Sequence, residues 1–200
     1  MSWQIVGSPH DIDGEANYDK SGKSVSISAD GTIVAIGANY NDGNGSNSGH
    51  VRIFRNIEGK WEQIGNDIDG EAIYDNSGES VSLSADGTVV AIGAKYNDGN
   101  GSNSGHVRIY KNINNNWIKI GDDINGEAVG DKLGTSVSLS ADGTIVAIGA
   151  PYNNANGEPD CGHVRIYRNI NNTWNQVGGD IYGIGDYENS GASGRLSSGG

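Results

Sequence analysis

Acidic residues recur at three places in the chain with a spacing that could support acid–base chemistry. The three groups are Asp11, Asp13 and Glu15; Asp67, Asp69 and Glu71; and Asp123 and Glu127 with Asn125 between them. Facing carboxylates can act as general acid and base, and such pairs hydrolyse glycosidic bonds. A catalytic pair is normally unique in a chain, so a group that returns three times favours a structural device or a multivalent binding surface. A carbohydrate- or glycan-active enzyme that uses these acidic connections is the alternative.

Three histidines recur in the same way. His50, His106 and His163 each open a similar segment, "HVRIF" or "HVRIY", about 56 residues from the next. This spacing predicts that they lie in separate structural units, where each starts a strand, rather than together in one catalytic site. His10 stands alone in a connection that is two residues longer, and we expect it to face solvent. Cys161 is the only cysteine, so no intrachain disulfide can form, and we expect a buried or idle thiol, with an intermolecular bridge as the alternative.

A glycine-rich loop, "NDGNGSNSGH", carries side-chain oxygens at alternate positions and occurs twice. Because Ca²⁺ takes six to eight oxygen ligands, the loop residues are candidate calcium ligands: Asp42, Asn44 and Ser46, and Asp98, Asn100 and Ser102. Each loop offers a single carboxylate, and the third copy, "NNANGEPDCG", breaks the spacing. Turn formation by Asn and Gly explains the same loop without a metal ion. Both interpretations therefore stay open.

Composition and charge argue against several classes of binding partner. The formal net charge of −12 opposes binding to a phosphate backbone or an anionic membrane. The start "MSWQIVGSPH" lacks the basic and apolar regions of a secretory signal, and no apolar run reaches the roughly 18 residues of a spanning helix. We therefore expect a soluble chain with no nucleic-acid partner and no membrane insertion. The 33 glycines with only 3 prolines indicate many tight turns, which is typical of a β protein.

Alignment of the repeats on their tryptophans reveals the elements that position these residues. Trp3, Trp61, Trp117 and Trp174 are separated by 58, 56 and 57 residues. One unit contains four strand-like runs: Ser80 to Ser84, Thr88 to Ala94, Gly105 to Tyr110, and Trp117 to Gly121. Four short strands per repeat predict an all-β fold, a β-propeller built of four-stranded blades. The Asp86-Gly87 pair predicts a two-residue hairpin turn with positive φ values between the first two strands.

The strand count gives three full blades with partial blade strands at both ends. We assign residues 1–21 to an N-terminal outer strand, around Trp3 to Gly7, and its connection; 22–77, 78–133 and 134–179 to blades 1, 2 and 3; and 180–200 to the start of an incomplete fourth blade. Three blades are fewer than the usual four to eight of a closed propeller. The two end blades would expose apolar faces to water, so we expect self-association into a homodimer or a larger assembly. The other explanation for the incomplete set of blades is that the chain is a fragment of a longer protein.

The repeated sequence segments also resemble those of a known family. "SVSLSADGTVVAIGA", "GHVRIYKN" and the following tryptophan are similar to FG-GAP repeats, whose Gly-Ala-Pro is present as Gly149, Ala150 and Pro151. The resemblance implies a β-propeller distantly like that of integrin α chains, and it implies adhesion or scaffolding, often with calcium. It also implies an extracellular, cell-surface or virion-associated location, and a protein or glycan ligand. We therefore expect a non-enzymatic module with no catalytic residues and no cofactor other than Ca²⁺.

Overall fold

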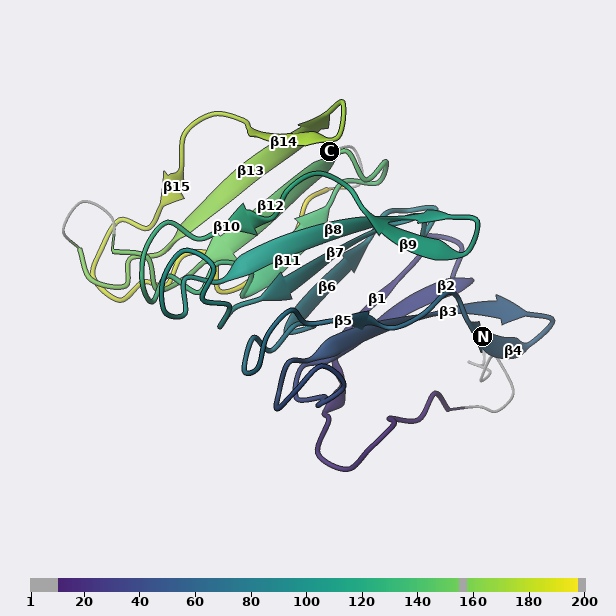
Figure 1. Ribbon diagram of the computed structural model, residues 1–200. Helices are drawn as coiled ribbons and strands as arrows, with labels where there is room; N and C mark the ends of the chain where they lie inside the picture. The colour runs from purple at the N-terminus through teal and green to yellow at the C-terminus, as the bar shows by residue number, and fades with distance from the viewer. Residues whose placement is uncertain (1–10, 155–157, 198–200) are drawn as a thin grey trace, which may run out of the picture.

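Each sequence repeat folds into one antiparallel sheet whose first four strands lie side by side in chain order. In the computed structural model, which describes residues 11–154 and 158–197, three such sheets stand next to one another (Figure 1). The described residues form fifteen strands and no helix. The outer strand predicted at Trp3 to Gly7, and His10, lie outside the described residues.

The three sheets have equivalent strands. The first contains β1 (Ser21–Ile27), β2 (Ile33–Ala38), β3 (His50–Ile57), β4 (Lys60–Gln63) and β5 (Ile68–Asp69). The second contains β6 (Ser80–Leu83), β7 (Val89–Ala94), β8 (His106–Ile113), β9 (Asn116–Lys119) and β10 (Ile124–Asn125). The third contains β11 (Ser136–Leu139), β12 (Ile145–Ala150), β13 (His163–Ile170), β14 (Thr173–Gln176) and β15 (Ile181–Tyr182).

The outer edge of each sheet is a broken strand. In the second sheet, β9 pairs with the end of β8, and the chain then turns at Gly121, where φ is 75°. It returns as the two-residue strand β10, which pairs with His106 and Val107 at the start of β8. The predicted outer strand from Trp117 to Gly121 therefore ends earlier, at Lys119, because the glycine redirects the backbone. This break brings the acidic connection against the histidine end of the sheet.

The inner hairpin turn differs from the predicted two-residue turn. Of Asp86 and Gly87, only Gly87 has a positive φ, 68°. The Ser84 backbone N–H donates to the carbonyl of Val89 (2.9 Å), while the Asp86 carboxylate accepts from the Ser84 hydroxyl (2.6 Å) and the Thr88 backbone N–H (2.9 Å). The predicted turn type was wrong because side-chain hydrogen bonds close a longer loop here.

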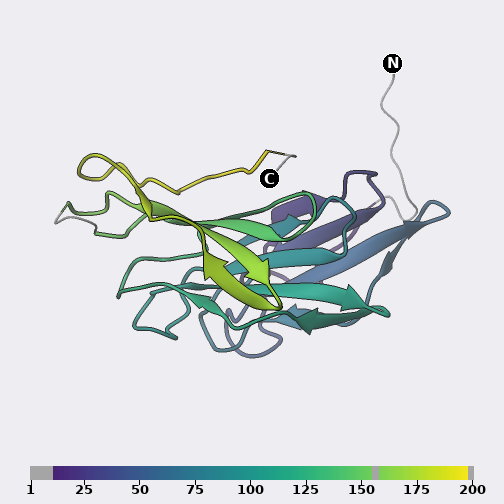
Figure 2. The ribbon, with the colours of Figure 1, turned by 90° about the horizontal axis from the view of Figure 1, so that it is seen from above.

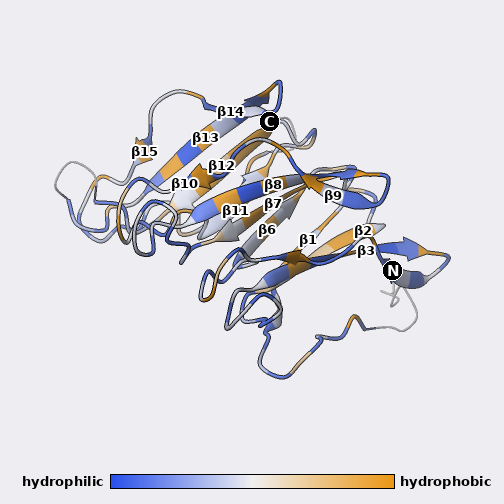
Figure 3. Ribbon diagram, in the orientation of Figure 1, coloured by the Kyte–Doolittle hydropathy of each residue, from blue (hydrophilic) through white to orange (hydrophobic). Residues whose placement is uncertain are grey.

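Apolar side chains fill the space between neighbouring sheets. Val81 and Leu83 of β6 belong to a buried cluster with Ile33, Ile53 and Ile68 of the first sheet. A second cluster joins β11 to the second sheet in the same way. Figure 3 shows apolar residues, in orange, on the strands, whereas the connecting loops are largely hydrophilic. The core therefore consists of the interfaces between blades, which is why one blade cannot be stable without its neighbours.

Hydrogen bonds repeat across both interfaces. The Ser80 hydroxyl donates to the carbonyl of Gly134 (2.8 Å), and the Leu139 N–H donates to the Ser82 hydroxyl (2.9 Å). The indole N–H of Trp117 donates to the carbonyl of Ile64 (2.9 Å). Equivalent serine bonds join the first and second sheets, and an equivalent indole bond joins the second and third. The repeated serines and tryptophans thus fix the register of one blade on the next.

The C-terminal tail docks on the third sheet as the inner strand of a further blade would. The Leu196 N–H donates to the Ser138 hydroxyl (2.9 Å), and the Ser136 hydroxyl donates to the carbonyl of Gly191 (2.8 Å). These contacts match those that the inner strand of the third sheet makes with the second. Up to residue 197 no strand forms in the tail, and Figure 2 shows it running back across the molecule.

Parts of the outward faces of the first and third sheets are exposed, although Val34, Ile36 and Phe54 of the first sheet are buried in a cluster against which Ile12 and Trp61 pack. Ile27 on β1 is 57% exposed, whereas the equivalent Leu83 on β6 is 8% exposed. Ile181 on β15 is 54% exposed, whereas the equivalent Ile124 on β10 is 6% exposed. Some side chains whose equivalents are buried at the internal interfaces, on β1 and β15, are therefore exposed at the two ends of the row. Among the described residues, no helix is long and apolar enough to cross a lipid bilayer.

Candidate functional site

Every sheet brings one histidine together with two carboxylates, within 4.8 Å of one another. The histidine begins the third strand, the glutamate comes from the connection before the sheet, and the aspartate comes from the connection after it. We call these groups clusters 1, 2 and 3: Glu15, His50 and Asp67; Glu71, His106 and Asp123; and Glu127, His163 and Asp180.

The strand ladders fix these positions in cluster 1. His50 is the first residue of β3, where it pairs with Ala38 on one side and with Asp69 on the other. Because β5 pairs with the start of β3, Asp67, which directly precedes β5, is held beside the histidine. Arg52 follows two residues after His50, so its side chain leaves the strand on the same face. The connection before β1 then supplies Glu15.

Arg52 holds the connection before the first sheet against β3. Its Nη2 donates to the backbone carbonyl of Asp13 (2.6 Å), and its Nη1 lies 3.6 Å from Oε1 of Glu15. Arg108 makes the same contacts with Asp69 (2.6 Å) and Glu71 (3.4 Å). Each arginine therefore ties an acidic connection to the following blade and orients its glutamate toward the histidine.

Cluster 1 has a histidine nitrogen between two carboxylates and bonded to neither. Nδ1 of His50 lies 3.7 Å from Oε2 of Glu15 and 3.6 Å from Oδ2 of Asp67, and it has no hydrogen-bond partner. The side chain of His50 is 1% exposed, whereas Glu15 and Asp67 are 43% and 29% exposed. The other oxygen of Asp67, Oδ1, accepts a hydrogen bond from Nε2 of Gln63 (2.6 Å).

Cluster 2 contains an additional cation. Lys119 occupies the position of Gln63, and its ammonium group lies 2.8 Å from Oδ1 of Asp123. This hydrogen bond raises the pKa of Lys119, so the ammonium stays charged. Burial, reinforced by Arg108, lowers the pKa of His106 to about 4, although the Asp123 carboxylate opposes the shift. His106 is therefore neutral at pH 7.

In cluster 3 the arginine binds both carboxylates. Arg165 donates to both carboxylate oxygens of Asp180 (2.9 and 2.8 Å) and also forms an ion pair with Glu127. Burial would raise the pKa of Asp180, but hydrogen bonds from Arg165, Gln176 and Tyr182 outweigh it and lower that pKa to about 2. Burial also lowers the pKa of His163. The two acids are thus neutralised by the chain itself.

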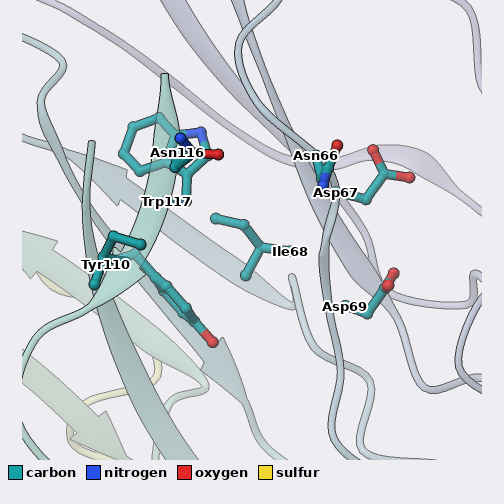
Figure 4. A pocket seen from close by; sticks show the side chains of 8 residues that line it. Asn66, Asp67, Ile68, Asp69, Tyr110, Asn116 and Trp117 are labelled. Atoms are coloured by element: carbon teal, nitrogen blue, oxygen red, sulfur yellow. The ribbon is translucent and has the colours of Figure 1, made fainter. Parts of the chain in front are cut away.

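A cleft opens beside Asp67 between the first and second sheets. It has a volume of about 380 Å³, and Figure 4 shows Asp67 and Asp69 across from Tyr110, Asn116 and Trp117. An equivalent cleft of about 210 Å³ lies between the second and third sheets, lined by Asp122, Asp123, Ile124, Asn125, Tyr167, Thr173 and Trp174. Carboxylates opposite aromatic rings therefore recur at both interfaces.

The candidate calcium loops lie beside the acidic connections, and their side chains make hydrogen bonds within the protein. Oδ1 of Asp42 accepts from the backbone N–H of Asn47 (2.7 Å), and the amide of Asn44 donates to the carbonyl of Gly70 (2.8 Å). The backbone carbonyl of Ser46 accepts from the N–H of Tyr74 (2.8 Å).

The second candidate loop repeats this pattern. Asp98 accepts from the N–H of Asn103 (2.7 Å), Asn100 donates to the carbonyl of Gly126 (2.8 Å), and the carbonyl of Ser102 accepts from Gly130 (2.9 Å). Turn chemistry therefore accounts for the shape of both loops. Calcium binding there stays a prediction.

The sequence correctly predicted one histidine and one acidic group for each repeat, but it did not predict that the histidines and the acids meet in space. His50, His106 and His163 begin β3, β8 and β13 in different sheets, as predicted. The missed feature is that the glutamate of one connection and an aspartate of the next meet at each histidine, with an arginine two residues later. The shared period of all four residue types is the signal that could have revealed it. Cys161 is buried, in agreement with the expectation.

Comparison with solved structures shows the fold. A crystal structure of a candidate 6-phosphogluconolactonase from Bacteroides uniformis superposes with a TM-score of 0.54 at 14% sequence identity, covering 82% of this chain and 41% of that chain. Hydrazine synthase from Kuenenia stuttgartiensis gives a TM-score of 0.49 at 11% identity, covering 80% and 36%. This chain thus spans less than half the length of either structure, and at such identity the likeness concerns the fold alone.

Comparison with protein families is more specific. No curated protein matches the sequence. The model of the FG-GAP repeat matches residues 5–54 and 67–110, which include β1, β2, β5 and most of β3 in the first sheet, and β6, β7 and most of β8 in the second. Together with the three blade-like sheets, this match shows that the chain contains FG-GAP repeats and has a β-propeller fold.

Proposed function

We propose that this chain is a non-enzymatic β-propeller module that works by assembly and binding through surfaces repeated from blade to blade. The observation that carries the proposal is the pair of open end faces. Val25 and Ile27 on β1 are 59% and 57% exposed, and Val177 and Ile181 on the third sheet are 43% and 54% exposed. Their equivalents where two blades meet are buried, apart from Ile120, which is half-buried.

The occupant of these faces is a second copy of the chain. The face of β1 has the residues with which β6 and β11 cover the preceding sheet. On the third sheet the C-terminal tail around Gly191 and Leu196 holds the inner-strand position, so we infer that β1 of a second copy displaces this tail and also covers Val177 and Ile181. The two ends are therefore the two halves of one interface, which a head-to-tail contact reunites. Burying a Val or Ile side chain contributes about 1.5 to 3 kcal/mol, so four such residues give a substantial driving force.

Light scattering on the 200-residue chain tests this assembly. We expect a mass that is a multiple of 20.8 kDa. Ile27→Lys places a charge in the proposed interface and should give a monomer. Ile113→Lys is the matched control, because Ile113 is 48% exposed at the end of β8 in the middle sheet. A folded wild-type monomer, or equal effects of the two variants, would refute the assembly.

The binding surface that we propose lies along the connections between blades. Exposed apolar side chains recur at the tips of these connections: Tyr18 is 91% exposed, Tyr74 58%, Val129 68% and Tyr187 67%. Such side chains, interspersed with carboxylates and amides, suit a protein or glycan ligand and repel nucleic acid. A repeated surface binds a repetitive ligand multivalently, which fits a role in adhesion. Glycan-array binding should weaken in a Tyr18→Ser, Tyr74→Ser variant.

The second candidate function is a carbohydrate-active enzyme. It is favoured by the cleft in which Asp67 and Asp69 face Tyr110 and Trp117, since glycosidases use paired carboxylates. Turnover of a glycan that is abolished by Asp69→Asn, but unaffected by the equivalent Asn125→Ala in the next cleft, would support the enzyme and contradict the binding module.

A further inference from the structure

We propose that cluster 1, formed by Glu15, His50 and Asp67, is a binding site for a divalent transition-metal ion, for which Zn²⁺ is the best match. Clusters 2 and 3 bind it weakly, because Lys119 and Arg165 already supply positive charge there. This site is separate from the candidate calcium loops, and it does not depend on the assembly proposed above.

The interatomic distances in cluster 1 match one shared ion. A tetrahedral zinc ion with nitrogen and oxygen ligands at about 2.0 to 2.2 Å separates neighbouring ligand atoms by about 3.4 Å. Nδ1 of His50 lies 3.7 Å from Oε2 of Glu15 and 3.6 Å from Oδ2 of Asp67. These distances exceed the roughly 2.7 to 3.2 Å of an N–H···O hydrogen bond, so the histidine nitrogen bonds to neither carboxylate, while all three ligand atoms lie within 4.8 Å of one another.

The histidine supplies the second indication of a ligand. Its side chain is 1% exposed, and its Nδ1 is a buried polar atom without a hydrogen-bond partner that faces both carboxylates. Buried polar atoms are normally paired because leaving one unpaired is unfavourable. A metal ion would pair with Nδ1 of neutral His50. The donor set of one imidazole and two carboxylates suits transition metals better than Ca²⁺, which prefers oxygen ligands alone.

The partners of the two carboxylates leave the inward oxygens available. Gln63 donates to Oδ1 of Asp67 (2.6 Å), so Oδ2 faces the histidine. Arg52 lies 3.6 Å from Oε1 of Glu15, so Oε2 faces the histidine. Outer groups of this kind orient metal ligands in known sites. Since Glu15 and Asp67 are 43% and 29% exposed, an ion can enter from solvent, and a fourth position stays open for water.

The other two clusters differ in the charge next to the aspartate. Lys119 replaces Gln63 in cluster 2 and forms an ion pair with Asp123 at 2.8 Å. In cluster 3, Arg165 contacts both oxygens of Asp180 and also Glu127. A divalent ion would have to displace or approach these cations, which reduces its affinity. The chain therefore contains one site and two internal controls with the same backbone.

Zinc titration of the chelator-treated, dialysed 200-residue chain tests the proposal. We expect about one equivalent of Zn²⁺ by calorimetry and elemental analysis, together with a rise in melting temperature. Asp67→Asn should weaken binding by at least about tenfold, while the matched variant Asp123→Asn should leave it unchanged. Lys119→Gln, which gives cluster 2 the glutamine found in cluster 1, should add a second equivalent.

Three results would overturn the proposal. They are the absence of zinc binding by the wild type at micromolar concentration, equal binding by wild type and Asp67→Asn, and equal losses in Asp67→Asn and Asp123→Asn. Circular dichroism and melting without zinc check that Asp67→Asn folds, which we expect because the asparagine carbonyl can still accept from Gln63. Loss of assembly in Ile27→Lys with retained zinc binding would separate this site from the proposed function.

Discussion

Replacing Gly93 by alanine tests whether the blades are held together by close backbone contact. Gly93 lies on β7, where a methyl group would overlap the backbone carbonyl of Gly134 in the next blade and the hydroxyl of Ser80. Its φ is not in the left-handed region, so the alanine backbone itself is unstrained. The expected effect therefore comes from the contact between blades.

The expected change in the free energy of unfolding is the sum of two destabilising contributions and one stabilising contribution. Overpacking in a tight interior costs about 1 to 3 kcal/mol. Displacing the Ser80 hydroxyl breaks its hydrogen bond to the Gly134 carbonyl, which costs about 1 kcal/mol. Against these, alanine in a strand is favoured over glycine by about 0.5 to 1 kcal/mol. The net expectation is a loss of about 2 kcal/mol in the free energy of unfolding.

Urea denaturation and thermal melting measure this loss. For a chain of this size, a loss of about 2 kcal/mol lowers the melting temperature by roughly 4 to 8 °C. Gly179→Ala is the control, since no atom lies within 4 Å of a methyl group there, and it should change stability by less than about 0.5 kcal/mol. Without the interblade contact, Gly93→Ala would stabilise the protein, so a neutral or stabilising result would refute the reasoning.

Three further predictions concern the interface, the buried histidine and the loops. Trp117→Phe removes the indole bond to Ile64 and should cost about 1 kcal/mol in urea denaturation, whereas Tyr187→Phe, at an exposed tyrosine, should have no effect. Burial and Arg108 lower the pKa of His106 to about 4, although Asp123 opposes this shift, and Lys119 and Glu71 also lie nearby. The unfolded chain therefore binds a proton at this histidine more readily than the folded chain does. Stability should fall by about 3 kcal/mol as the pH falls from about 6.5 to 4, and a His106→Gln variant with the same pH profile would contradict this. If the loops at 42–48 and 98–104 bind Ca²⁺, millimolar calcium should raise the melting temperature, and Asp42→Asn should reduce the shift; an unchanged melting temperature would exclude the site.

The local elements could be read from the sequence, but some of their details could not. The runs predicted as strands at Ser80 to Ser84 and Thr88 to Ala94 correspond, to within one residue, to β6 and β7. The turn between them was mispredicted because the Ser84 and Asp86 side chains, rather than backbone preference alone, close it. The break between β9 and β10 was also missed, since pairing of β10 with β8 depends on a partner distant in the sequence.

The sequence by itself determined the repeat, the four-strand blade and the positions of the histidines, because each depends on patterns within one repeat. Only the tertiary structure decided which residues of different repeats meet. Glu15 and Asp67 belong to successive connections, and they converge on His50 because β5 pairs with β3 and Arg52 holds the preceding connection. Tertiary structure likewise distinguishes the three clusters: the difference between Gln63 and Lys119 matters only because each lies against an aspartate beside a buried histidine.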